Sequence, residues 1–143
     1  MMDEKRLTER VKLRAEFHLL KTVPGIGERL ATVIMLETGT VARFAEVGQF
    51  SSYCRCVDSV RQSNGRKKGE GNTRNGNAYL AWAFIEAANF ALMQCPPARR
   101  CYEREQRATN RVVALKAVEH KLARACYYML REQQSFDVTR CFT

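Results

Sequence analysis

A short break at residues 23–27, with the sequence Val-Pro-Gly-Ile-Gly, limits the possible folds of this chain more than any other feature. Before the break, residues 3–22 carry apolar side chains about four positions apart, typical of one helix face: Leu7, Val11, Ala15 and Leu19. After it, residues 28–38 repeat apolar side chains at helical spacing, and Gly39 is a candidate C-cap. Two helices joined by so short a turn are expected to pack as a hairpin.

The rest of the chain also shows helical periods, without a strand pattern or an internal repeat. Further helices are predicted at about 47–54, 77–93, 98–107 and 110–131, with the second apolar all round and so expected at the centre of the core. Residues 58–76 are polar and glycine-rich and predict a long loop, and the tail at 134–143 is expected to be irregular. The predicted fold is all-α: a helix-hairpin-helix followed by a long basic loop and a helical bundle.

The charge balance favours a polyanionic partner. The chain of 143 residues has 24 Lys and Arg against 15 Asp and Glu, a formal net charge of +9, which does not by itself distinguish DNA, RNA and an acidic membrane. No apolar run approaches the roughly 20 residues that span a bilayer, and the N-terminus lacks a secretory apolar stretch. The expectation is a cytoplasmic protein without a membrane partner.

The cysteines do not form a recognisable metal-binding or disulfide pattern. Their spacings include no Cys-x-x-Cys pair, and His18 and His120 stand apart from them. Free cysteine packs as a small hydrophobic side chain. We therefore expect reduced cysteines and no cofactor or metal site in this chain. The six are Cys54, Cys56, Cys95, Cys101, Cys126 and Cys141.

The break at 23–27 has a chemistry of its own. Glycines without side chains let the backbone approach a phosphate, and the N-terminus of the following helix directs free N–H groups and its positive dipole end outward. The pattern predicts DNA-backbone contacts that do not read sequence. The alternative is an ordinary turn whose glycines only permit close helix packing. The predicted contact residues are Lys21, Gly25, Ile26, Gly27 and Arg29.

The predicted loop is strongly basic and contains a serine. Between residues 61 and 77, five cations stand against one acid. By composition alone this is a solvated loop that adds electrostatic affinity. A serine among arginines has another use, because cations stabilise the charge that develops when its hydroxyl attacks a phosphodiester. The candidates are Ser63 as nucleophile and Arg61, Arg66, Lys67, Lys68, Arg74, Asn75 and Asn77 as DNA-binding residues.

Several short motifs occur together in a recognisable order. They are the Val-Pro-Gly-Ile-Gly run, Arg43-Phe44, Phe50-x-x-Tyr53, Gln62-Ser63-Asn64-Gly65, Gly76-Asn77-x-x-Leu80 and Glu86-Ala87-Ala88. In this combination, over roughly residues 17–130, the chain resembles the C-terminal region of the IS110 group of insertion-sequence transposases. The resemblance implies DNA transposition through a serine-DNA intermediate, with Ser63 at the nucleophile's position.

The resemblance carries further expectations about organisation and partners. It implies a separate N-terminal RuvC-like domain whose four carboxylates bind divalent metal, with residues 1–22 as a connector to that missing domain and 17–133 as the transposase C-terminal domain. It also implies a homo-oligomer in the full-length protein and, in some members, a structured guide RNA. The chain departs from the group's pattern at 53–56, Tyr-Cys-Arg-Cys, and at Ala81, where an arginine is frequent.

Other interpretations remain open on the residues alone. The chain fits a non-catalytic helix-hairpin-helix nucleic-acid-binding module, including a remnant of a disrupted element, and the stripe at 3–22 fits an oligomerisation helix. The tyrosines at 79, 102, 127 and 128 lie in helical contexts that favour packing over nucleophilic attack. A series of arginines fits two interpretations equally well, a contact with a second nucleic-acid strand or a solvated helix face. The residues are Arg99, Arg100, Arg104, Arg107 and Arg111.

Overall fold

A computed structural model describes residues 4–6, 10, 14–56 and 76–143 of the chain. The described residues form helices without strands, so the predicted all-α class is confirmed. The elements are α2 (Ala15–Leu20), α3 (Glu28–Thr38), the 3-10 helix η1 (Val41–Arg43), α4 (Val47–Tyr53), α6 (Ala78–Gln94), α7 (Pro96–Ala108), α8 (Arg111–Glu132) and α9 (Val138–Phe142).

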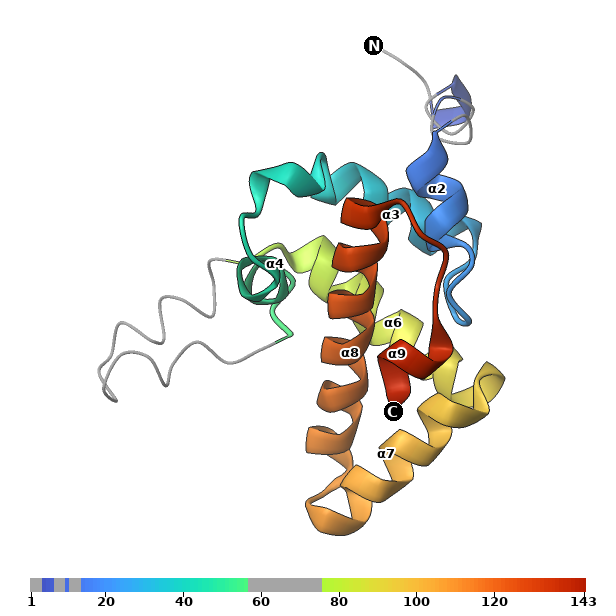
Figure 1. The fold of residues 1–143 in the computed structure, drawn as a ribbon, viewed down its shortest axis with the longest axis vertical. Helices are drawn as coiled ribbons and strands as arrows, with labels where there is room; N and C mark the ends of the chain where they lie inside the picture. The colour runs from blue at the N-terminus through green and yellow to red at the C-terminus, as the bar shows by residue number, and fades with distance from the viewer. Residues whose placement is uncertain (1–3, 7–9, 11–13, 57–75) are drawn as a thin grey trace, which may run out of the picture.

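The long helix α8 is the centre of the packing. It contacts α2, η1, α4, α6, α7 and α9, while α3 packs on α6 across one end of the bundle (Figure 1). On its inner face α8 buries Val118, Leu122 and Cys126, which are four residues apart and therefore share one side of the helix. The side chain of Asn110 caps the first turn by accepting the Val113 N–H at 2.9 Å.

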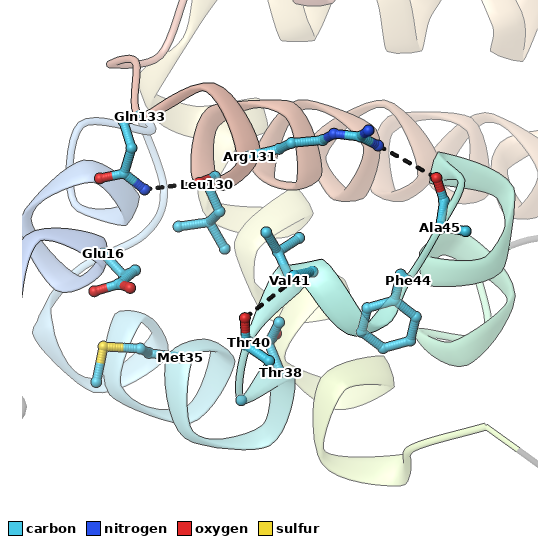
Figure 2. Close-up of a pocket in the computed structure, with 12 residues that line it drawn as sticks. Glu16, Met35, Thr38, Thr40, Val41, Phe44, Ala45, Leu130, Arg131 and Gln133 are labelled. Atoms are coloured by element: carbon cyan, nitrogen blue, oxygen red, sulfur yellow. Dashed lines mark hydrogen bonds between the residues drawn. The ribbon is translucent and has the colours of Figure 1, made fainter.

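The connection from α3 to α4 is fastened to the C-terminal end of α8. The buried Tyr127 hydroxyl donates to the carbonyl oxygen of Phe44 at 2.8 Å, and Arg131 donates to the Tyr127 hydroxyl at 2.7 Å. Arg131 also reaches the Ala45 carbonyl at 3.2 Å (Figure 2). Beside these bonds lies a cavity of about 350 Å³, between the end of α3 and the end of α8. Tyr127 thus has a packing role, as its helical context predicted.

Two predicted segments differ from the structure at the ends of the chain. Among the described residues, the predicted helix 3–22 is interrupted at Arg14, which has extended backbone angles, and α2 buries Phe17 and Leu20, while Ala15 is exposed. The predicted stripe was therefore wrong at Ala15 and partly correct at Leu19, which packs half-buried against the core, because the helix that begins after Arg14 directs Phe17 and Leu20 inward. The tail expected to be irregular contains α9, where Asp137 accepts N–H groups of Thr139 and Arg140.

The prediction that α6 is central was correct for only one of its faces. Leu80, Phe84 and Ala87 are completely buried. The opposite face exposes large apolar side chains to solvent, namely Tyr79, Trp82, Ile85, Phe90 and Met93. A helix that is apolar all round has no period to show which side faces the core, so the sequence did not distinguish the two faces.

Candidate nucleic-acid interface

The turn between α2 and α3 is held by its apolar residues. Val23 and Ile26 are 2% and 4% exposed, and the Ile26 N–H donates to the Val23 carbonyl at 3.0 Å. Ile26, one of the predicted contact residues, packs into the core. We call α2, the turn at residues 21–27 and α3 the hairpin. Because its apolar side chains point inward, the polar groups of the turn are left toward the outside.

The first glycine of the turn, Gly25, faces α6 and not the solvent. It is buried with a φ of +107°, and a Cβ atom placed there would lie 2.7 Å from the Ala87 carbonyl oxygen and 2.8 Å from the Ala91 nitrogen. Those atoms belong to the backbone of a helix and cannot move aside. Gly25 therefore permits close packing of the turn on α6, which is the role that the alternative interpretation gave to the glycines.

The second glycine, Gly27, has the opposite surroundings. It is exposed, and a Cβ atom there would have no neighbour within 4 Å. Gly27 is the N-cap of α3, and no side chain caps that helix end, whereas Asn77 and Asn110 cap α6 and α8 through their side-chain oxygens. The open first turn of α3 leaves backbone N–H groups facing outward, although the acidic Glu28 lies in the same turn.

Two cations flank this open end. Lys21 and Arg29 are both exposed. The Lys21 ammonium lies 5.3 Å from the centre of the Phe17 ring, and the Arg29 guanidinium lies 5.7 Å from the centre of the Trp82 ring. The aromatic rings restrict the basic side chains without neutralising them. The structure thus brings together the five residues that the sequence singled out in the hairpin, with Gly25 and Ile26 inside and the other three outside.

The hairpin and α6 together line an open hollow of about 560 Å³. The contribution of α6 was not predicted from the sequence, and its lining residues are Trp82, Glu86, Phe90 and Gln94. Trp82 and Phe90 are 39% and 40% exposed, so their rings present apolar surface beside the two cations. These α6 residues can be identified only from the tertiary structure, because it is the packing of Gly25 on α6 that brings them next to the hairpin.

A second close contact between segments lies where the chain enters and leaves the predicted basic loop. The Asn77 N–H donates to the Tyr53 carbonyl at 2.7 Å, and the Arg55 guanidinium donates to the Gly76 carbonyl at 3.2 Å. A Cβ atom on Gly76 would lie 2.8 Å from the same Tyr53 carbonyl oxygen. Residues 53–55 and 76–77, on the two sides of segment 57–75, are therefore bound directly to one another. We call these residues the loop base.

Asn77 is the centre of the loop base. Its side-chain oxygen accepts the Leu80 N–H at 2.9 Å, so Asn77 is the N-cap of α6. Its side-chain nitrogen donates to Glu37 at 2.8 Å and to the Tyr53 hydroxyl at 3.2 Å. The hydrogen bond from Asn77, and then Arg43, lower the pKa of the Tyr53 hydroxyl. Asn77 thus connects α3, α4 and α6, and its predicted contact with DNA stays a prediction.

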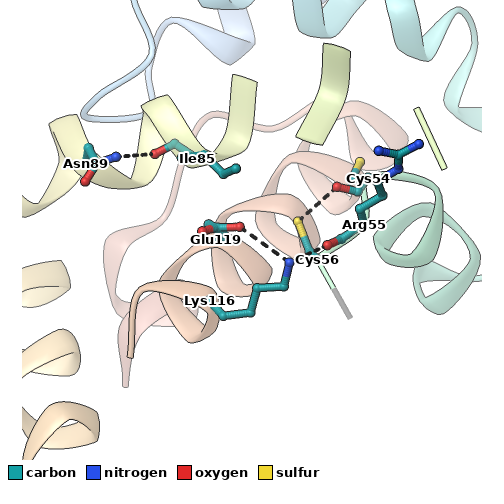
Figure 3. Close-up of polar contacts among 7 residues, drawn as sticks. All are labelled: Cys54, Arg55, Cys56, Ile85, Asn89, Lys116 and Glu119. Carbon is teal, nitrogen blue, oxygen red and sulfur yellow. Dashed lines mark hydrogen bonds and ion pairs between the residues drawn. The ribbon is translucent and has the colours of Figure 1, made fainter. Parts of the chain in front are cut away.

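A polar contact that includes one buried carboxyl group extends the loop base to α8. Lys116 donates to the Arg55 carbonyl at 2.6 Å and lies 3.9 Å from Glu119 (Figure 3). Glu119 is 5% exposed, and burial raises the pKa of its carboxyl group. Burial also raises the pKa of the adjacent Cys56 thiol to about 12, so this cysteine stays protonated at neutral pH. All six cysteines are free, as predicted, and five of them are buried.

Comparison with known proteins decides the family. Residues 17–103 match the transposase family described as IS116/IS110/IS902. This chain belongs to that family. It is also 30% identical, over 121 residues, to the insertion element IS110 uncharacterized 43.6 kDa protein of Streptomyces coelicolor. That alignment covers 83% of the chain and 30% of the relative, so the chain spans less than a third of the length of this curated relative.

The family match covers the hairpin, the loop base, α6 and the first half of α7. The resemblance inferred from the motifs is thereby confirmed at the level of the transposase family. The catalytic candidate and most of the predicted basic contacts fall on residues outside the described part of the chain: Arg61, Ser63, Arg66, Lys67, Lys68, Arg74 and Asn75. Of the loop residues predicted to bind DNA, only Asn77 is described.

Neither a metal site nor a membrane segment is found among the described residues of this transposase chain. Histidine, cysteine and acidic side chains do not gather there in groups of three that would hold a metal ion. Within the same ranges, no helix has both the length and the apolar character needed to cross a bilayer.

Proposed function

We propose that this chain holds DNA in transposition and supplies Ser63 as the nucleophile for strand transfer. The observation that carries the proposal is the family match across residues 17–103, which includes both the hairpin and the serine-containing segment. The net charge of +9 and the open, cation-flanked end of α3 support DNA as the ligand. We further propose that the chain works in the bacterial cytoplasm, where its DNA substrate is found.

The hairpin contact would use only the outer side of the turn. The exposed Gly27 and the first N–H groups of α3 receive a phosphate, while Lys21 and Arg29 add charge from either side. Gly25 and Ile26 support this contact from within by fixing the turn on α6 and in the core. Such a contact holds the DNA backbone without selecting a base sequence.

The proposed chemistry forms one bond and breaks one bond in each step. The Ser63 Oγ loses its proton and attacks a DNA phosphorus atom, the bond from phosphorus to a sugar oxygen breaks, and that oxygen takes up a proton. The resulting phosphoserine ester keeps the bond energy, so the hydroxyl of another strand can reverse the step and join itself to the phosphate. The cations that lie close to Ser63 in the sequence would stabilise the negative charge; they are Arg61, Arg66, Lys67, Lys68 and Arg74.

The loop base gives this nucleophile a fixed point of attachment. Hydrogen bonds from Asn77 to α3 and α4, and from Arg55 to Gly76, hold the two ends of the segment that contains Ser63. We propose that Asn77 acts as a positioning residue for that segment. We propose that carboxylates of a separate domain would bind the divalent metal, that the full-length protein is a homo-oligomer, and that a structured guide RNA is a candidate partner.

The test is a covalent protein-DNA adduct. We expect a protein that joins a metal-binding N-terminal domain to this chain to form an adduct with element-end DNA that survives denaturing electrophoresis. Ser63→Ala should abolish it, and Ser52→Ala, at an exposed serine of α4, should not. Equal adduct in Ser63→Ala and wild type would remove Ser63 from the mechanism and favour a non-catalytic DNA-binding module. The chain alone is expected to bind DNA without cutting it.

A further inference from the structure

One face of α7 carries a row of arginines. Arg100, Arg104 and Arg107 are four and three residues apart, so they lie on the same side of the helix, and all three are exposed. We call them the arginine stripe. On the other side of α7, Ala98 and Cys101 are buried against the bundle. The helix therefore directs its small side chains to the core and its cations to the solvent.

The arginine stripe lacks counter-ions within the described part of the chain. The ion pair on α7 joins Arg99 to Glu103 at 3.1 Å, and none of the three stripe residues forms an ion pair with a described residue. Like charges three or four residues apart destabilise a helix by a few tenths of a kcal/mol per pair. A face that is merely solvated usually mixes both signs of charge. The uncompensated row is thus better suited to an anionic ligand than to water alone.

The tail of the chain builds a surface around the stripe. Arg100 and Arg104 line a hollow of about 330 Å³ together with Thr139 and Phe142 of α9. Phe142 is buried, and α9 packs on both α7 and α8 (Figure 1). At its start, the tail is bound to the hairpin, because the Phe136 N–H donates to the Thr22 hydroxyl at 2.9 Å. The tail therefore connects the hairpin to the stripe and fixes one relative to the other.

We propose that the arginine stripe is a second contact surface for the backbone of duplex DNA, separate from the hairpin. This inference rests on the proposed function in taking DNA as the ligand. From Arg100 to Arg107 the helix rises about 10 Å, and duplex DNA carries one charge per roughly 1.7 Å of its axis. Several phosphates lie within that length. Guanidinium groups bind phosphate oxygens in pairs, so the choice of arginine in place of lysine agrees with such a contact.

The experiment measures binding of the whole 143-residue chain to a labelled mixed-sequence DNA duplex by fluorescence anisotropy across a range of salt concentrations. The variant R100Q/R104Q/R107Q keeps good helix-forming residues on an exposed face, so its circular dichroism and Tm should equal those of wild type. We expect about a tenfold or larger rise in Kd at moderate salt. The slope of log Kd against log salt concentration should also fall by about two to three, because each lost phosphate contact lowers that slope by about 0.9.

A charge-matched control distinguishes a contact at the arginine stripe from a general effect of net charge. R10Q/R14Q/R124Q removes the same charge from exposed positions outside α7 and should change Kd much less. Equal losses in the two triple variants would overturn the stripe, as would an unchanged Kd in R100Q/R104Q/R107Q. A loss seen only with a duplex RNA probe would also overturn it.

The hairpin variant K21Q/R29Q distinguishes the stripe from the proposed function. If it weakens binding and the stripe variant does not, the stripe proposal fails and the hairpin contact stands. If only the stripe variant weakens binding, the hairpin contact fails and the stripe stands. A wild-type chain that does not bind duplex DNA at all would refute both.

Discussion

The hairpin turn and the loop base both pack a glycine against a neighbouring segment, but they differ in whether their polar groups face the solvent or bind other parts of the protein. Each places a glycine against backbone atoms of a neighbouring segment, with Gly25 on α6 and Gly76 on Tyr53. In the hairpin the remaining groups, Lys21 and Gly27, face the solvent. In the loop base, Asn77 directs its side-chain hydrogen bonds to other parts of the protein. A glycine-containing turn is thus a candidate binding surface only where its polar groups are left unused.

The largest expected effect is on the buried side of the hairpin. Gly25→Ala places a Cβ atom within 2.8 Å of two backbone atoms of α6 at a φ of +107°. Overpacking and backbone strain together should lower the free energy of unfolding by about 2–5 kcal/mol. Urea denaturation followed by circular dichroism measures the loss. Gly27→Ala is the matched control and should cost less than about 1 kcal/mol, so similar losses in both would contradict the contrast between the two glycines.

The open side of the hairpin should affect binding and not stability. Replacing Lys21 and Arg29 with glutamine removes two exposed cations, and we expect about a tenfold rise in the Kd for duplex DNA at moderate salt. The Tm should stay within a few degrees of wild type. Anisotropy titrations and thermal melts of the same samples provide both values. A large fall in Tm would show that these side chains support the fold, and would contradict the expected difference between the hairpin and the loop base.

In the loop base, by contrast, substitution should lower the stability of the fold. Asn77→Ala removes an N-cap and two further hydrogen bonds, and we expect a loss of about 1–2 kcal/mol in the free energy of unfolding. Asn110→Ala removes an N-cap alone and should cost about 1 kcal/mol. Chemical denaturation compares the two. If Asn77→Ala costs no more than Asn110→Ala, the bonds to Glu37 and Tyr53 do not strengthen the loop base.

The smallest expected effect concerns the buried carboxyl next to the loop base. The pKa of Glu119 is raised by burial, so the carboxyl favours the folded state at acidic pH, below its unfolded pKa of about 4.3. That stability is lost as the pH rises through the folded-state pKa. Glu119→Gln should therefore be slightly more stable than wild type at pH 7, and the difference should disappear toward pH 4. Denaturation at the two pH values tests this, and a pH-independent difference would refute it.

The sequence predicted features that depend on neighbouring residues along the chain. The helices predicted at about 47–54, 77–93, 98–107 and 110–131 correspond closely to α4, α6, α7 and α8, because helix-forming composition and periodicity are local signals. The sequence also led to the transposase family, through the order of its short motifs. These features need no knowledge of what lies on the other side of the molecule.

Features that depend on distant residues were not predictable in the same way. Whether Gly25 faces a phosphate or α6 depends on Ala87 and Ala91, more than 60 positions away. The helix α9 was missed because Phe142 gains its burial from tertiary contacts. The bond from Asn77 to Glu37 joins residues 40 apart and has no local signal. Tertiary packing decided each of these cases.

The closed loop base has a consequence for variation of the chain. Because Tyr53 and Arg55 are bonded directly to Asn77 and Gly76, the fold on either side does not depend on the length of what connects them. Doubling the length of a closed loop costs only about 0.6 kcal/mol in entropy. A change in the number of residues between positions 56 and 76 should therefore leave the helices folded, while the proposed strand transfer still requires Ser63 and its cations.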